Sequence, residues 1–192
     1  MLSKEKLRKR YSKIRKFGYF EINSSFFKPF FKLINPLTKS KKKTIYISFY
    51  YPSNYEVNIL KFLEKIKKKK KIISLLPYLN KKNEMNFTKW QYLDNLKVNK
   101  YGMLEPSLNL KPNVPDVMLI PLLAFDTKNN RLGYGKGYYD NFLNKYLKKN
   151  KNILTIGVAF SFQRYDKLPI SKYDVSLNYI LTEKAMIKKW IY

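Results

Sequence analysis

The sequence of 192 residues has no cysteine and no histidine. Without cysteine there are no disulfides, thiolate zinc sites or cysteine nucleophiles, and without histidine there are no imidazole metal ligands or serine–histidine relays. Any catalysis must therefore use carboxylates, lysines, tyrosines, backbone amides or a metal held by carboxylates. Long hydrophobic runs are also lacking, since the run at 117–123 is far shorter than the ~20 residues that span a bilayer. The basic first ten residues precede no apolar segment, so we expect no secretory signal, no membrane partner and a cytoplasmic location.

Acidic residues are scarce, with 13 Asp and Glu against 40 Lys and Arg, and the net charge is +27. A charge of this size is typical of nucleic-acid-binding proteins. Only five of the cations are arginines, although arginine is the residue that binds bases and phosphates in bidentate fashion. The lysine runs at 41–43 and 67–71 are expected to be solvated loop charge. We therefore expect no specific nucleic-acid partner.

Aromatic residues are abundant at 17%, and 45% of the chain is hydrophobic, which is enough for one domain over residues 1–192 with its own core. The pattern predicts helices at 3–16, at 26–31 with a break at Pro29 or Pro36, and at 55–68, 138–148 and 184–190. It predicts strands at 44–51, 71–76, 83–90, 116–120, 153–160 and 177–181, with Pro77 ending the second and the third at a sheet edge. Alternating strands and helices favour an α/β fold of three layers, α/β/α, with a mostly parallel sheet.

The first predicted helix has two sides. Leu7, Tyr11, Ile14 and Phe17 recur at helical spacing and form its expected apolar face. Lys4, Arg8 and Arg15 are expected on the polar side.

Glycine is also scarce, and three of the six glycines lie at 133, 135 and 137. The loop follows a predicted buried strand and opens a predicted helix, so its amides and the helix N-terminus can form an anion site, to which Arg131 and Lys136 add charge. The spacing matches neither the dinucleotide motif nor the Walker loop. A glycine-rich turn without a ligand is the alternative. Asp126 and Asp140 favour a site, because magnesium requires oxygen ligands near the phosphates.

The segments 121–126 (PLLAFD) and 131–140 (RLGYGKGYYD) closely resemble the signature of the 5-formyltetrahydrofolate cyclo-ligase family. Further landmarks follow in the family's order over almost the whole chain: Lys4 with Arg8, Tyr51-Pro52, Glu56-Val57, Met85, Phe87, Trp90, 102–106 (GMLEP), Pro115-Asp116, 156–160 (IGVAF), Gln163, Leu168-Pro169, Asp174 and Thr182-Glu183. Two features depart from the family pattern. Tyr173 stands where many relatives have histidine, and the segment 19–43 has no counterpart that can be aligned.

This resemblance implies a ribose-5-phosphate isomerase-like fold and the ATP- and Mg²⁺-dependent conversion of 5-formyltetrahydrofolate, with one or more glutamates in its tail, to 5,10-methenyltetrahydrofolate, ADP and phosphate. It implies a monomer. A reaction of this kind depends on positioning and charge neutralisation rather than on a protein nucleophile. The alternative is a non-catalytic basic RNA- or phosphate-binding domain, in which Asp126, Asp140 and Asp174 would have no reason to lie beside the phosphate site.

The resemblance also assigns roles to individual residues. The implied ATP-binding residues are Lys4, Arg8, Arg131, Leu132, Gly133, Tyr134, Gly135, Lys136, Gly137, Tyr138, Tyr139 and Asp140, with Arg131 and Lys136 as the catalytic cations. Glu56, Trp90 and Tyr138 are implied to bind the folate, and Asp140 and Asp174 to bind magnesium. Some of these residues have simpler explanations. Lys4 and Arg8 could be solvated charge, Glu56 could be a helix-dipole partner, and the two aromatic residues could belong to the core.

Overall fold

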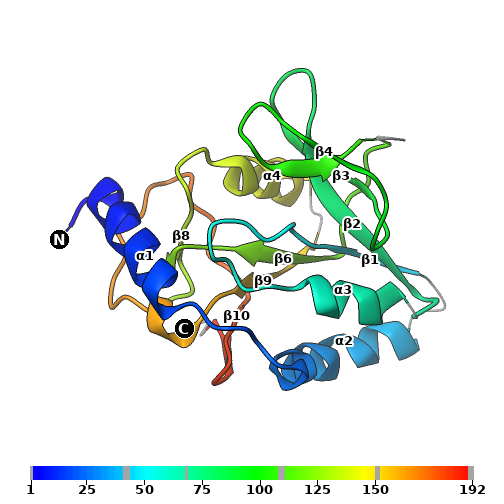
Figure 1. Ribbon diagram of the computed structural model, residues 1–192, viewed down its shortest axis with the longest axis horizontal. Coiled ribbons are helices and arrows are strands. Elements are labelled where there is room, and N and C mark those ends of the chain that lie inside the picture. Colours follow the sequence, from blue (N-terminus) through cyan, green and yellow to red (C-terminus); the bar gives the residue numbers. More distant parts are fainter. Residues whose placement is uncertain (1, 41–43, 68, 108–110, 150–151, 190–192) are drawn as a thin grey trace.

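The computed structural model describes residues 2–40, 44–67, 69–107, 111–149 and 152–189. Its centre is a seven-stranded sheet in the order β11-β10-β9-β6-β1-β2-β3 (Figure 1). The five inner strands, which run parallel, are β1 (Ile45–Ser48), β2 (Ile72–Leu79), β6 (Val117–Pro121), β9 (Leu154–Val158) and β10 (Tyr179–Leu181). The antiparallel edge strands are β3 (Met85–Lys89) and β11 (Met186–Lys188). The predicted mostly parallel sheet is confirmed, as is the edge position of β3.

Helices cover both faces of this sheet. Figure 1 shows α2 (Lys28–Ser40) and α3 (Leu60–Lys67) on one side and α4 (Tyr138–Leu147) on the other. Successive residues of a strand point to opposite faces, and in β6 Leu119 belongs to the cluster under α3 while Met118 and Ile120 belong to the cluster under α4. Every residue of β6 is buried for this reason. The three layers predicted from the sequence are present.

Helix α1 (Lys4–Gly18) lies beside these layers and packs Leu7 and Tyr11 against the short strands β7 (Ala124–Phe125) and β8 (Arg131–Leu132). The side chain of Ser3 caps its start by accepting from the amide of Lys6. Two predictions for this helix are wrong. Arg15 is buried at 2% exposure, whereas Phe17 is 85% exposed. The spacing of positions 4, 8, 11 and 15 puts all four side chains on one helix face, and that face points inward.

Prolines break fewer elements than the sequence predicted. Strand β2 continues through Pro77 because beyond Leu75 it pairs only with β3, so the missing proline N–H lies on a side without a neighbouring strand of the sheet. The segment predicted to break at Pro29 or Pro36 contains a short 3₁₀ turn, η1 (Ser24–Phe27), followed by α2, which spans both prolines. Pro29 lies in the first turn, where its missing N–H has no helical partner to lose.

Two predicted helices are shorter or absent. Residues 55–59 are not helical, and α3 begins only at Leu60, whose amide donates to the side chain of Asn58. The predicted helix at 184–190 is wrong over its described part, because residues 186–188 pair with β10 as strand β11; residue 190 lies outside the described residues. Pairing with an open sheet edge outweighs the weak helix preference of so short a segment.

The sequence did not predict β7 and β8, nor the hairpin of β4 (Leu96–Val98) and β5 (Leu104–Pro106), nor the 3₁₀ turn η2 (Ser161–Gln163). In the described part of the chain, no helix has the length and hydrophobicity needed to cross a bilayer.

Candidate functional site

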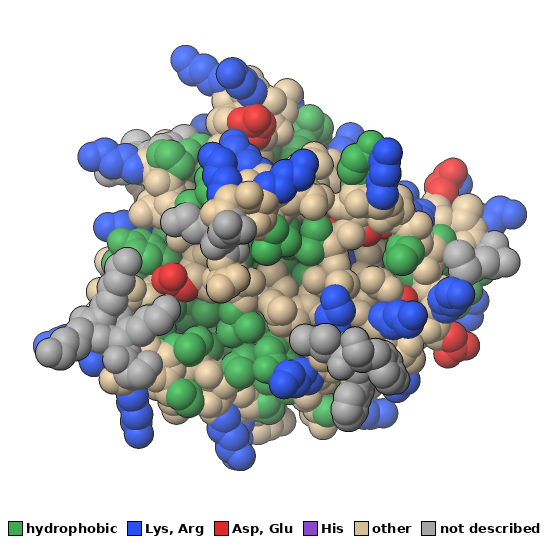
Figure 2. Space-filling view, turned by 180° about the vertical axis from the view of Figure 1, so that it is seen from behind, with side chains coloured by type: hydrophobic (Ala, Val, Ile, Leu, Met, Phe, Trp, Pro, Cys, Tyr) green, Lys and Arg blue, Asp and Glu red, His purple; other side chains and the backbone are tan. Residues whose placement is uncertain are grey.

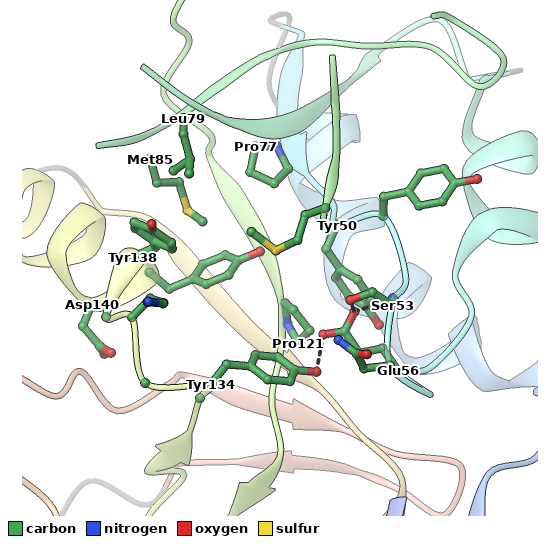
Figure 3. A pocket seen from close by; sticks show the side chains of 18 of the residues that line it. Tyr50, Ser53, Glu56, Pro77, Leu79, Met85, Pro121, Tyr134, Tyr138 and Asp140 are labelled. Atoms are coloured by element: carbon green, nitrogen blue, oxygen red, sulfur yellow. Dashed lines mark hydrogen bonds between the residues drawn. The ribbon is translucent and has the colours of Figure 1, made fainter. Parts of the chain in front are cut away.

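A cavity of about 440 Å³ opens where the parallel strands end. The carboxyl end of such strands is where open α/β sheets bind ligands. Tyr50 follows β1, Pro121 ends β6, and the glycine loop, α1 and the β4–β5 hairpin complete the walls. The apolar part of the lining comes from Pro77, Leu79, Met85, Met103 and Leu104. Figure 3 shows Glu56 on one side of this cavity and Tyr138 and Asp140 on the other, with the hydroxyl of Tyr134 directed toward Glu56.

The glycine loop connects β8 to α4 and lines the cavity from residue 133 to residue 137. Gly135 has a φ of +105°, and a Cβ there would lie 3.3 Å from Cζ of Arg8. Arg8 donates from Nε to the carbonyl of Gly133 at 3.0 Å, so the helix α1 and the loop hold each other. Gly137, with a φ of +67°, precedes α4 without a side-chain cap. The first amides of α4 therefore remain available to an anion.

Four cations border this loop: Lys4, Arg8, Arg131 and Lys136 all line the cavity. The side chain of Arg131 is 5% exposed, and its Nη2 lies 2.8 Å from Oδ1 of Asp140 as an ion pair. Neither Nε nor Nη2 of Arg131 has an aligned hydrogen-bond acceptor in the described part of the chain. Buried donors without acceptors are unfavourable, and an anion in the cavity would supply the missing acceptors.

Asp140 and Asp174 border the same wall of the cavity. Asp140 accepts from the amide of Val175 at 3.1 Å, and the neighbouring Asp174 pairs with Lys4 and accepts from the amide of Ser171. Partial burial would raise the pKa of Asp174, but the hydrogen bond and charge of Lys4 and the Ser171 amide bring that pKa below its usual value. Among the described residues, no group of three or more carboxylates forms a metal cage.

Asp126 has a structural role instead. It is buried and accepts hydrogen bonds from the amides of Lys128, Asn130 and Leu168. It is absent from the cavity lining. The expectation that it supplies an oxygen ligand beside the phosphates is therefore wrong, because its carboxylate oxygens accept the hydrogen bonds that stabilise the turn between β7 and β8.

Glu56 lies in the loop before α3 and points into the cavity (Figure 3). Its Oε1 accepts from the hydroxyl of Tyr134 at 2.6 Å and its Oε2 from the amide of Ser53 at 2.9 Å. Burial raises the pKa of Glu56, and the bonds from Tyr134 and Ser53 and the charge of Arg15 only partly offset this. Because Glu56 lies four residues before α3 and faces the cavity, its geometry is that of a ligand-binding group rather than a helix-dipole partner.

Two predicted aromatic contacts have different outcomes. Tyr138 lines the cavity, and a hydrogen bond with the hydroxyl of Tyr101, on the β4–β5 hairpin, raises the pKa of Tyr138 to about 12. Trp90 is absent from the lining. It is 3% exposed in the core under α3, and its Nε1 donates to the carbonyl of Asp94. The prediction that Trp90 lines the folate pocket is wrong, since the chain turns its ring toward the helix layer.

The remaining predicted residues, Leu132, Tyr134 and Tyr139, also line the cavity. Tyr173 does not, and its ring is 65% exposed. Sequence reasoning missed the contribution of the hairpin and of Arg15. The hairpin left no periodic signal, whereas the spacing of Arg15 from Lys4 and Arg8 places it on the same helix face.

A glycine loop at the carboxyl ends of parallel strands, beside a largely apolar cavity lined by the buried Glu56, is typical of proteins that bind a phosphorylated ligand next to an organic one. The model of the 5-formyltetrahydrofolate cyclo-ligase family matches residues 3–183, and the chain belongs to this family.

Individual relatives agree with this membership. The chain is 40% identical over 90 residues to 5-formyltetrahydrofolate cyclo-ligase of Haemophilus influenzae, which is 45% of this chain and only 47% of that protein. It is 39% identical over 124 residues to the Mycoplasma genitalium cyclo-ligase, which is 57% of this chain and 72% of that protein.

Two solved structures resemble the whole chain. The 5,10-methenyltetrahydrofolate synthetase of Aquifex aeolicus has a TM-score of 0.70 at 26% identity, with 98% of this chain and 94% of the other covered. The synthetase of Mycoplasma pneumoniae has a TM-score of 0.65 at 29% identity, with 94% and 98% covered. These matches favour the cyclo-ligase over the non-catalytic basic domain.

The surface charge is not gathered in one place on the face drawn in Figure 2. There the Lys and Arg side chains are distributed around the surface, with hydrophobic side chains between them.

Proposed function

We propose that this chain, acting as one domain over residues 1–192, converts 5-formyltetrahydrofolate and MgATP to 5,10-methenyltetrahydrofolate, ADP and phosphate. The observation that carries the proposal is the meeting of two sites in one cavity. Arg131 offers buried donors without an aligned acceptor among the described residues at the glycine loop, and Glu56 offers a buried acceptor across the cavity. A monomeric protein in the cytoplasm, acting on folates with one or more glutamates, is part of the same proposal.

The formyl oxygen of the substrate is a poor leaving group, and its phosphorylation makes it a good one. The formyl oxygen attacks the γ-phosphorus of ATP, and the bond to ADP breaks. N10 of the folate then bonds to the activated formyl carbon and loses its proton to the departing phosphate, which carries away the former formyl oxygen. Negative charge moves over the phosphoryl oxygens in the first step, so positioned cations accelerate it. Lys136 and Arg131 supply that charge in the proposal, while Lys4, Arg8 and the loop amides hold the remaining phosphate oxygens.

The folate ring is placed by the opposite end of the cavity. Both oxygens of Glu56 already accept hydrogen bonds, Oε1 from Tyr134 and Oε2 from the amide and hydroxyl of Ser53, and the carboxylate retains lone pairs for further donors. A reduced pterin presents adjacent N–H donors, which match a carboxylate. Tyr138 and the apolar residues of β2 and the hairpin enclose the rest of the ring.

Magnesium would be held by Asp140 and Asp174 together with phosphate oxygens. These two carboxylates suit an ion that takes one or two protein ligands and keeps several waters. In the structure Asp140 pairs with Arg131 and Asp174 pairs with Lys4. Arrival of the nucleotide would give both cations new anionic partners and free the carboxylates. Bound magnesium would neutralise phosphate charge.

The test is the increase in methenyltetrahydrofolate absorbance when purified protein is mixed with 5-formyltetrahydrofolate and MgATP. We expect turnover that stops when ATP is omitted and falls strongly in Glu56→Gln. Absence of product with a folded wild-type protein would overturn the proposal. Product formation that ignores ATP would do the same.

A further inference from the structure

Arg15 is a buried cation to which the proposed reaction gives no direct role. It lies on α1, is 2% exposed, and does not line the cavity. Its Nη1 donates to the carbonyl of Leu122 at 3.1 Å, and its Nη2 donates at 2.6 Å both to the carbonyl of Asn54 and to the hydroxyl of Tyr134. Burial of an arginine is unfavourable unless its donors are used. The partners of Arg15 therefore show what it stabilises.

The direction of these hydrogen bonds favours one protonation state of Glu56. A guanidinium can only donate, so the oxygen of Tyr134 must accept from Arg15. The single hydroxyl proton of Tyr134 is then directed to Oε1 of Glu56, at 2.6 Å. The amide of Ser53 donates to Oε2. Both oxygens of Glu56 thus accept hydrogen bonds from the protein, an arrangement that favours the carboxylate over the carboxylic acid.

The same guanidinium also holds the loop that carries Glu56. Asn54 and Tyr55 have φ values of +47° and +62°, a left-handed conformation that is unfavourable for two successive residues other than glycine. The bond from Arg15 to the carbonyl of Asn54 stabilises this conformation. Arg15 therefore connects α1 to both the tyrosine that bonds to Glu56 and the backbone that positions it.

We propose that Arg15 is a positioning residue, which acts through Tyr134 and Asn54 to hold Glu56 as an acceptor-only carboxylate facing the donor edge of the folate ring. This inference rests on the proposed function for the identity of the ring, but not for the state of Glu56.

The groups around Glu56 come from several parts of the fold. They are Arg15 from α1, Tyr50 after β1, Ser53 in the loop itself, and Tyr134 and Tyr139 from the glycine loop and α4. Burial raises the pKa of Glu56, and Arg15 is the cation in this group that opposes the effect. If Arg15 loses its charge, the pKa of Glu56 rises further and the carboxylate is lost at a higher pH.

The first experiment measures kcat and both KM values against pH for Arg15→Met, with Arg15→Lys and Arg10→Met for comparison. Arg10 is exposed on the same helix, so its substitution controls for loss of charge from α1. We expect Arg15→Met to raise KM for 5-formyltetrahydrofolate about tenfold and to move the acid limb of its pH profile up by about one unit. KM for MgATP should change little, Arg15→Lys should recover part of the shift, and Arg10→Met should behave as wild type. An unmoved acid limb in Arg15→Met would overturn the inference.

The second experiment needs no substrate. The chain has seven glutamates, so ¹³C labelling of their side-chain carboxyls gives few signals, and Glu56→Gln identifies the one from Glu56. We expect that signal to titrate at higher pH in Arg15→Met than in wild type. Tyr134→Phe keeps the arginine but removes the connecting hydroxyl. It should also shift the titration upward, and it decides the question if Arg15→Met does not fold.

The two proposals can fail separately. An inactive wild type with a shifted titration in the variants would remove the proposed reaction and retain the role of Arg15. An active wild type with identical Glu56 titrations in all variants would retain the reaction and remove the role of Arg15.

Discussion

Lys136 stands between two glycines with positive φ and reaches over the ring of Tyr101, with Nζ 5.3 Å from the ring centroid. Lys136 belongs to the glycine loop and lies just before α4 begins. We expect Lys136→Ala to lower kcat/KM for MgATP by about thirtyfold, or ~2 kcal/mol, because a charge-assisted contact to phosphate is lost. Steady-state kinetics will measure this. Lys145→Ala, at an exposed lysine of α4, is the control, and equal effects of the two substitutions would remove Lys136 from the site.

The carboxylate of Asp140 serves two partners, the guanidinium of Arg131 and the amide of Val175. If Asp140 also takes part in holding magnesium, Asp140→Asn should raise the magnesium concentration needed for half-maximal activity several-fold, because an amide is a weaker ligand than a carboxylate. Asp174→Asn should do so more mildly. A magnesium titration at saturating ATP measures both effects. An unchanged magnesium requirement with a raised KM for ATP would mean that Asp140 only orients Arg131.

At the scale of elements, the β4–β5 hairpin depends on one buried carboxylate. Glu105 accepts from the amide of Leu79 at 3.1 Å and from the side chain of Asn99 at 3.2 Å, and its other oxygen lies 3.6 Å from Nζ of Lys97. These contacts tie the hairpin to β2 and close its turn. The hairpin in turn forms the wall of the cavity that contacts Tyr138.

We therefore expect Glu105→Gln to loosen the hairpin and to lower the free energy of unfolding by about 1–2 kcal/mol. Chymotrypsin should cut sooner after Tyr101, which lies at the tip, and thermal unfolding should begin at a lower temperature. Glu84→Gln is the control, because Glu84 is exposed. Cleavage at the same rate in Glu105→Gln and wild type would show that the strand pairing alone holds the hairpin.

The elements that the sequence predicted are those with a strong local signal. The five inner strands are apolar runs covered on both faces, and the glycine loop is marked by half of the glycines of the chain. The hairpin was missed because its strands are only three residues long, too short for a periodic pattern of apolar residues. Helical periodicity placed Arg15 and Lys4 on one face, but only Tyr134 and Asn54, distant in sequence, make that face an interior one. The position of Trp90 was predicted wrongly for a similar reason. Trp90 follows the last residue of β3, and at the end of a strand a ring can turn toward either face of the sheet.

For the whole molecule, the net charge of +27 predicts weak attraction to any polyanion. We expect RNA and DNA to bind at low salt without sequence preference and to dissociate steeply as the salt concentration approaches physiological values, because that binding comes from counterion release. Electrophoretic mobility shifts over a salt series, run with two unrelated sequences, will test this. Tight binding to one sequence at physiological salt would contradict it. Folate turnover should persist across the series.

The first helix is joined to the last third of the chain. Lys4 pairs with Asp174, 170 positions later, and the hydroxyl of Tyr11 donates to the carbonyl of Arg164, 153 positions later. A ribosome releases α1 well before these two partners. The cavity wall that includes Lys4 and Asp174 therefore cannot be complete until residue 174 has left the ribosome, although Leu7 and Tyr11 can pack against β7 and β8 before that. Contacts of such long range also slow folding, so we expect the pairing of Lys4 with Asp174 to form late.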